Sequence, residues 1–107
     1  MTIEKWFDNL PENYTSKELA KKLYTAIVIN FPQLKICEEN KVGQASYIDT
    51  FYFQWDKEEH HLEIEVTEEN QFEYFYRNRK SNECLAGYFL NEFPDELSII
   101  AEHYKNV

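Results

Sequence analysis

Hydrophobic and polar residues alternate through most of the second half of the chain. The clearest run covers residues 61–67, in which Leu62, Ile64 and Val66 alternate with polar or charged side chains. A period of two is typical of a β-strand that buries one of its faces. The other runs that predict strands cover residues 47–55, 72–79 and 84–90, and a weaker one covers residues 34–38.

Short polar segments separate these runs, at residues 39–43, 56–59, 68–70 and 80–83. Connections this short join neighbouring strands as antiparallel hairpins, because a parallel pair needs a much longer crossover. The pattern therefore predicts a meander, in which each strand pairs with the next one along the chain.

Apolar residues three and four positions apart predict helices on either side of this region. One helix covers about residues 15–30 and begins with a capping box at Thr15. Another follows Pro94, and a short helix is expected over residues 2–10. The apolar stripe of the helix after Pro94 consists of Leu97, Ile100, Ala101 and Tyr104.

Together these patterns predict an α+β fold: an antiparallel meander sheet of four to five strands with N-terminal and C-terminal helices packed on one face. A chain of 107 residues has the usual size of one domain, so we expect residues 1–107 to share a single core. Aromatic residues make up 17% of the chain, and large rings are therefore expected to fill much of that core.

The longest wholly apolar run, at residues 26–29, is too short to cross a membrane. The N-terminal residues lack a basic segment followed by an apolar one, so no signal peptide is predicted. We therefore expect a cytoplasmic protein without membrane association, in which Cys37 and Cys84 are buried free thiols rather than a disulfide.

Charge adds the main clue to function. The formal net charge is −9, and the segment from Asp56 to Glu73 holds eight acidic residues against a single lysine, Lys57. The long-range field of such a chain repels nucleic acid and anionic lipid, and it favours a basic protein partner.

Alternation places several of these acids on the solvent-facing side of the predicted sheet, beside the aromatic residue Phe75. Exposed aromatic anchors with charged neighbours are typical of protein-binding surfaces. The expected contact residues are Tyr52, Glu58, Glu59, Glu63, Glu65, Glu73 and Phe75. The alternative is a solvated face on which Glu63 or Glu65 pairs with Arg77 across neighbouring strands.

No motif for catalysis, cofactor binding or metal binding accompanies this surface. Two glycines could hardly form a phosphate-binding loop, and the adjacent His60 and His61 point to opposite faces of a strand. A nucleophile–base pair of Cys84 with either histidine stays open, without support from the local sequence. We therefore expect a protein that is not an enzyme, with no catalytic residues, cofactor or metal.

These observations favour a protein-binding module, most concretely an inhibitor or immunity-type protein that neutralises a basic partner through its acidic sheet face. One alternative is a self-associating structural domain, a homodimer through the face of Phe75 rather than a monomer. Another is a decoy whose carboxylates imitate a nucleic-acid backbone. A third is a small-ligand-binding or enzymatic domain with a pocket between the sheet and the helices.

Overall fold

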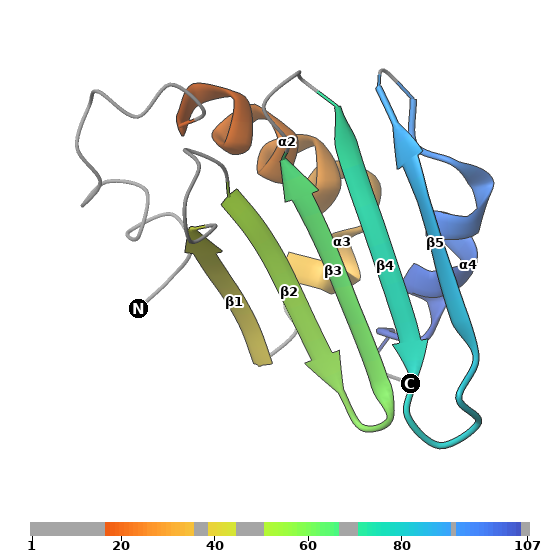
Figure 1. Cartoon of the computed structure of the whole chain (residues 1–107). Coiled ribbons are helices and arrows are strands. Elements are labelled where there is room, and N and C mark those ends of the chain that lie inside the picture. Colours follow the sequence, from red (N-terminus) through yellow and green to blue (C-terminus); the bar gives the residue numbers. More distant parts are fainter. Residues whose placement is uncertain (1–16, 36–38, 45–50, 67–70, 91, 106–107) are drawn as a thin grey trace.

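Five antiparallel strands form one sheet whose spatial order, β1-β2-β3-β4-β5, is also their order along the chain (Figure 1). This computed structural model describes residues 17–35, 39–44, 51–66, 71–90 and 92–105. The strands are β1 (Glu39–Gln44), β2 (Phe51–Lys57), β3 (His60–Val66), β4 (Phe72–Asn78) and β5 (Cys84–Phe89). The predicted meander is confirmed, and β1 and β5 form the two opposite edges of the sheet.

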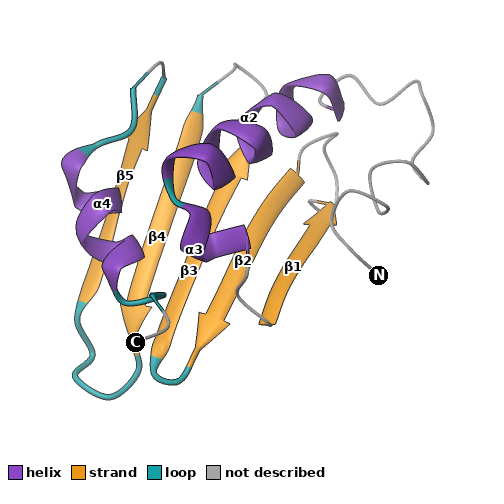
Figure 2. Ribbon diagram, turned by 180° about the vertical axis from the view of Figure 1, so that it is seen from behind, coloured by secondary structure: helices purple, strands orange, loops and turns teal. Residues whose placement is uncertain are grey.

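Helices cover one face of this sheet, so that the described part of the fold has two layers (Figure 2). They are α2 (Lys17–Asn30), α3 (Pro32–Lys35) and α4 (Asp95–Glu102). The view from behind shows α2 crossing several strands near one end of the sheet, whereas α4 lies over β4 and β5. The α+β class with helices packed on one face is therefore confirmed. The helix expected over residues 2–10 and the cap at Thr15 lie outside the described residues.

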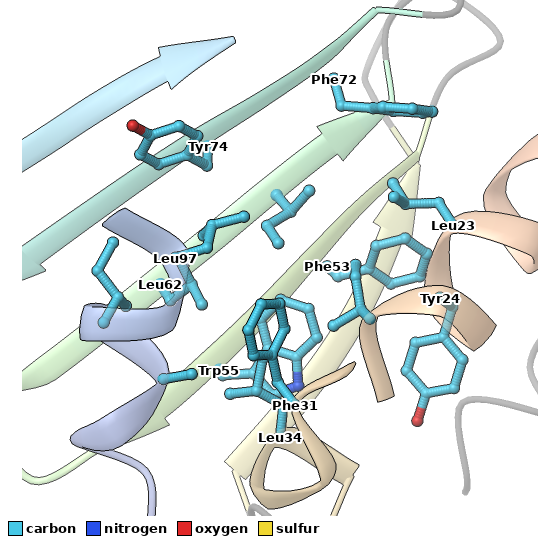
Figure 3. Close-up of a cluster of buried hydrophobic side chains, with 14 of the residues drawn as sticks. Leu23, Tyr24, Phe31, Leu34, Phe53, Trp55, Leu62, Phe72, Tyr74 and Leu97 are labelled. Atoms are coloured by element: carbon cyan, nitrogen blue, oxygen red, sulfur yellow. The ribbon is translucent and has the colours of Figure 1, made fainter. Parts of the chain in front are cut away.

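The hydrophobic core lies between the two layers and follows the predicted alternation along the strands (Figure 3). In β2, Phe51, Phe53 and Trp55 are fully buried, and the residues between them are only half-buried. Aromatic rings fill much of this core, as expected from the composition: the rings of Tyr24 and Phe53, for example, lie 5.5 Å apart. The apolar stripe predicted for the C-terminal helix is also buried. It consists of Leu97, Ile100 and Ala101 in α4 and of Tyr104 just after it.

Two predictions for the segment between α2 and β2 are wrong. Residues 34–38 were expected to form a strand, but Pro32–Lys35 forms the short helix α3, and residues 36–38 lie outside the described residues. The amide of Leu34 donates to the carbonyl of Phe31 at 2.9 Å. Both Phe31 and Leu34 are buried, and residues three apart share one side of a helix but not of a strand. The polar segment expected as a turn is strand β1, which pairs with β2 along its whole length.

The expectation of buried thiols is also wrong where the structure tests it. Cys84 is exposed at the start of β5, and Cys37 lies outside the described residues. The predicted run had placed Cys84 in a strand correctly, but this strand is an edge on which alternate residues face solvent.

Tyr74 connects the sheet to α4. Its partner across the β4–β5 pair is Gly87, where a Cβ atom would lie 2.9 Å from atoms of the Tyr74 ring. The ring can therefore lie over β5, where its hydroxyl donates a hydrogen bond to the carboxylate of Glu96. Burial, this hydrogen bond and the negative charge of Glu96 raise the pKa of Tyr74 to about 12.

We expect Tyr74→Phe to lower the free energy of unfolding by about 1 kcal/mol near neutral pH, because a hydrogen bond to a carboxylate is lost. Since folding raises the pKa of Tyr74, its contribution is complete below the ordinary value of 10 and disappears as the pH rises toward 12. The stability difference between wild type and variant should therefore shrink across that range in urea unfolding. A difference that stays constant throughout would contradict this account of the Tyr74–Glu96 contact.

Candidate partner-binding face

The face of the sheet opposite the helices carries five of the seven predicted contact residues, and we call it the open face. The pairing register aligns side chains in rows that run from β2 across β3 and β4 to β5. The first row is Tyr52, Glu65, Glu73 and Tyr88; the second is Gln54, Glu63, Phe75 and Ala86; the third is Asp56, His61, Arg77 and Cys84.

A hollow of about 280 Å³ lies where the first two rows cross β3, β4 and β5. Three carboxylates line it, from Glu63, Glu65 and Glu73, and we call it the acidic hollow. Two aromatic residues stand beside them: Phe75, which is 37% exposed, and Tyr88, which is 64% exposed. The structure thus brings four of the seven predicted contact residues together around one concave surface.

Like charges face each other inside the acidic hollow. Glu65 and Glu73 are direct partners across the β3–β4 pair, a position at which two carboxylates destabilise a sheet. Partial burial, and then the charges of Glu73 and Glu63, raise the pKa of Glu65. Within the described residues neither Glu65 nor Glu73 forms an ion pair. The folded protein therefore holds uncompensated negative charge at this place.

The alternative, in which Glu63 or Glu65 pairs with Arg77, is not what the register shows. The register places Arg77 opposite His61, whereas Glu63 faces Phe75 and Glu65 faces Glu73. Cross-strand pairs with arginine therefore do not neutralise the glutamates of the acidic hollow.

Acidic charge at the other end of the open face is neutralised internally. Asp56 Oδ1 lies 2.7 Å from His61 Nδ1, and it accepts a hydrogen bond of 2.7 Å from Arg79 Nη2. Gln54 donates to the second oxygen of Asp56, and His61 Nε2 lies 3.1 Å from Glu63 Oε1. Burial opposes ionisation of Asp56, but the hydrogen bonds from Gln54, His61 and Arg79 outweigh it and lower the pKa of Asp56. This end of the face therefore offers less free charge than the acidic hollow.

The other three predicted contact residues lie outside the acidic hollow. Tyr52 is half-buried on β2, next to Glu65 in its row. Glu58 and Glu59 form the turn between β2 and β3, where Glu58 has a left-handed φ of 55°. Glu65 follows Glu59 by six positions along the strand, a distance of about 20 Å at the usual rise per residue. A partner seated in the hollow thus reaches Tyr52 more readily than the turn.

The two histidines do lie on opposite faces, as predicted. His60 is buried on the core side, where its Nδ1 lies 2.7 Å from the Tyr76 hydroxyl and its ring stacks on His103 with centroids 4.3 Å apart. Burial, and then the charge of His103, lower the pKa of His60. Because that group resists protonation in the folded protein, the stability it contributes is present above its ordinary pKa of 6.5 and is lost as the pH falls.

The residues considered for catalysis and metal binding are not brought together. Arg77 stands between His61 and Cys84 in their row, which separates them by two strand spacings, or about 10 Å. Among the residues that the structure describes, no group of three or more His, Cys, Asp or Glu is placed to hold a metal ion. No helix in the same part of the chain is long and apolar enough to cross a membrane.

Sequence reasoning missed Tyr88, the aromatic residue at the rim of the hollow. Its neighbours on the same side of β5 are Cys84 and Ala86, which are small and uncharged. Because neither residue is clearly polar, the sequence does not show that this side of the strand faces solvent.

Comparisons with protein-family models, with curated proteins and with solved structures found no match to this chain. The chemistry of the open face is therefore the basis on which a function can be argued.

We expect Glu65→Gln to raise the free energy of unfolding by about 0.5 kcal/mol near neutral pH, because it removes one of two opposed like charges. The pKa of Glu65 is raised on folding, so its charged form is the one that the fold disfavours. The gain should therefore vanish once the pH falls below the ordinary value of 4.5. Glu92→Gln, at an exposed position on the helix side, is the matched control and should change stability by only a few tenths of a kcal/mol. Urea unfolding measures both, and a loss of stability in Glu65→Gln would contradict the account.

Proposed function

We propose that this protein binds a basic protein through its open face, and that the acidic hollow is the centre of the contact. The observation that carries the proposal is the uncompensated Glu65–Glu73 pair beside two exposed aromatic residues. Opposed carboxylates cost stability in the free protein, and a lysine or arginine from a partner would relieve that cost on binding. Binding of a basic partner would therefore explain why the protein carries both Glu65 and Glu73 despite their mutual repulsion.

The shape and composition of the hollow support the same conclusion. Phe75 and Tyr88 provide apolar area of the kind that anchors interfaces, and the three glutamates provide the charge that steers a basic surface toward them. A partner with a cationic cleft, such as a nuclease or a toxin whose site binds polyanions, has the complementary chemistry. In its most concrete form, the proposal is an inhibitor or immunity-type protein that blocks such a cleft.

The space between sheet and helices supports a ligand-binding function less well. Aromatic and aliphatic side chains fill the core there, and Trp55, Tyr76 and Tyr104 are almost completely buried. The hollow of about 230 Å³ beside α2 is lined mainly by apolar residues, among them Leu23, Phe72 and Phe89. A pocket for a polar substrate would need several convergent polar groups.

Capture of partners from host lysate at low salt tests the proposal. The bait is the wild-type protein, and the comparison is the double variant Glu65→Gln with Glu73→Gln. The control double variant, Glu18→Gln in α2 with Glu92→Gln, changes the net charge equally but at exposed positions on the helix side of the fold. We expect a basic protein that wild type and control retain, that the hollow variant loses, and that elutes as salt rises. Equal retention by both variants would contradict the proposal.

A further inference from the structure

The outer edge of β5 exposes backbone hydrogen-bonding groups. The amide of Asn78 donates to the carbonyl of Glu83 at 2.9 Å, and in the register of β4 and β5 this makes Tyr74–Gly87 one of the pairs that exchange hydrogen bonds. Alternate residues of β5 must then direct their N–H and C=O groups away from β4. These residues are Cys84, Ala86 and Tyr88. Among the described strands none lies on that side, because β5 is the last strand of the sheet.

Strand β5 itself lacks the residues and the irregularities that often prevent strand pairing at an edge. Proteins protect exposed edges with charged side chains, prolines or bulges, yet Cys84–Phe89 contains no charged residue and no proline. All six residues of β5 pair regularly with β4, without a bulge. The edge is therefore a ready template for one more strand.

The acidic hollow adjoins this edge. Ala86 and Tyr88, whose backbone groups point outward, also line the hollow with their side chains. A sixth strand would lie about 5 Å from β5 and about 10 Å from β4. A lysine side chain on the open face is about 6 Å long, so it could pass over the Tyr88 ring and reach toward Glu73.

We propose that β5 binds an extended basic segment of the partner protein as a sixth strand, antiparallel like the other pairs of the sheet, with lysine or arginine at every second position over the acidic hollow. The inference rests on the proposed function and specifies how the partner binds. Charge complementarity selects this occupant over a second copy of the chain, because self-pairing would bring together two proteins of net charge −9.

The probe is a capped synthetic peptide of alternating threonine and lysine. When the peptide pairs antiparallel to β5 with its lysines on the open face, the lysine N–H groups point toward β5, because the two residues of an antiparallel hydrogen-bonded pair have side chains on the same face. Two isomers of the peptide carry backbone N-methyl groups either on the lysines or on the threonines. They have equal mass and charge, but only the first isomer loses the hydrogen bonds to the protein.

We expect the unmodified peptide and the threonine-methylated isomer to bind, and the lysine-methylated isomer to bind roughly tenfold more weakly or worse. Binding should also slow solvent exchange of the Ala86 and Tyr88 amides, which NMR of labelled wild-type protein detects. In the variant Ala86→Pro, the proline removes an N–H that points away from β4, so the fold should persist while peptide binding falls. Should that variant not fold, the isomer pair still tests the proposal on wild-type protein.

Other outcomes separate this inference from the proposed function. Equal affinity of the two isomers, with shifted resonances of Glu65 and Glu73 but unprotected edge amides, would overturn strand addition and leave the acidic-face proposal standing. No response at either the hollow or the edge would contradict both. Protection of the Ala86 and Tyr88 amides that grows with protein concentration, without peptide, would overturn the inference in favour of a second copy.

Discussion

Replacement of Trp55 by alanine is expected to lower the free energy of unfolding by about 3–5 kcal/mol, the largest loss we predict for a single substitution. Trp55 is fully buried in β2, between the sheet and the helices (Figure 3). Its removal costs the transfer free energy of the indole and leaves a cavity that the neighbouring rings cannot fill. A domain of this size is usually stable by only about 5–15 kcal/mol, so the variant should be close to unfolding at room temperature.

Two further variants show whether volume or polarity is responsible. The indole N–H of Trp55 is buried and finds no hydrogen-bond acceptor in the described structure. Trp55→Phe removes that unsatisfied donor while it keeps an aromatic ring, so we expect a loss of only about 1 kcal/mol. Tyr88→Ala, at an exposed edge position, should change stability by about 0.5 kcal/mol or less. Urea unfolding followed by circular dichroism measures the stability of all three variants. If Trp55→Ala loses less stability than Tyr88→Ala, the described packing of the core is contradicted.

Reversal of charge at Glu65 and Glu73 is the substitution with the largest expected effect on binding. With both residues changed to lysine, we expect the affinity for the captured basic protein to fall about 100-fold or more, because like charges then meet across the interface. The dependence of affinity on salt should flatten, since fewer favourable charge contacts remain to be screened. Two lysines repeat the original opposition of like charges, so the fold should be no less stable than wild type.

The control for this experiment changes the net charge by the same amount elsewhere. Glu18→Lys with Glu92→Lys alters exposed residues on the helix side, so it shares any effect of overall charge but spares the open face. Isothermal titration over a series of salt concentrations compares the three proteins. If the hollow variant and the control lose equal affinity, overall charge rather than the acidic hollow determines binding.

The sequence predicted those elements whose own side chains carry the signal. Strand β3 was expected at residues 61–67 and is found at His60–Val66, because each of its apolar residues faces the core. In contrast, the residues of β1 are mostly polar, and this segment is a strand because its backbone pairs with β2. Backbone pairing of this kind cannot be predicted from a hydrophobic pattern. The helix α3 was mistaken for a strand because a segment of four residues is too short to show a period.

The composition of the candidate site was predictable, but its pairing was not. Alternation alone places Glu63, Glu65 and Glu73 on one face, and in the structure all three line one hollow. Which residues face each other depends on register, and a shift of two positions along β4 would have put Arg77 rather than Phe75 opposite Glu63. The cluster of Asp56, His61 and Arg79 joins three segments of the chain, so only the folded arrangement reveals it.

The agreement between the order of the strands in the sheet and their order in the chain has a consequence for folding kinetics. Every strand pair is closed by a short connection, so little chain entropy must be lost before each new ladder forms. Low contact order of this kind is associated with fast folding for a protein rich in β-structure. The last strand, β5, has a ladder on one side only, and we expect its amides to be the first of the β2–β5 meander to exchange with solvent during native-state fluctuations.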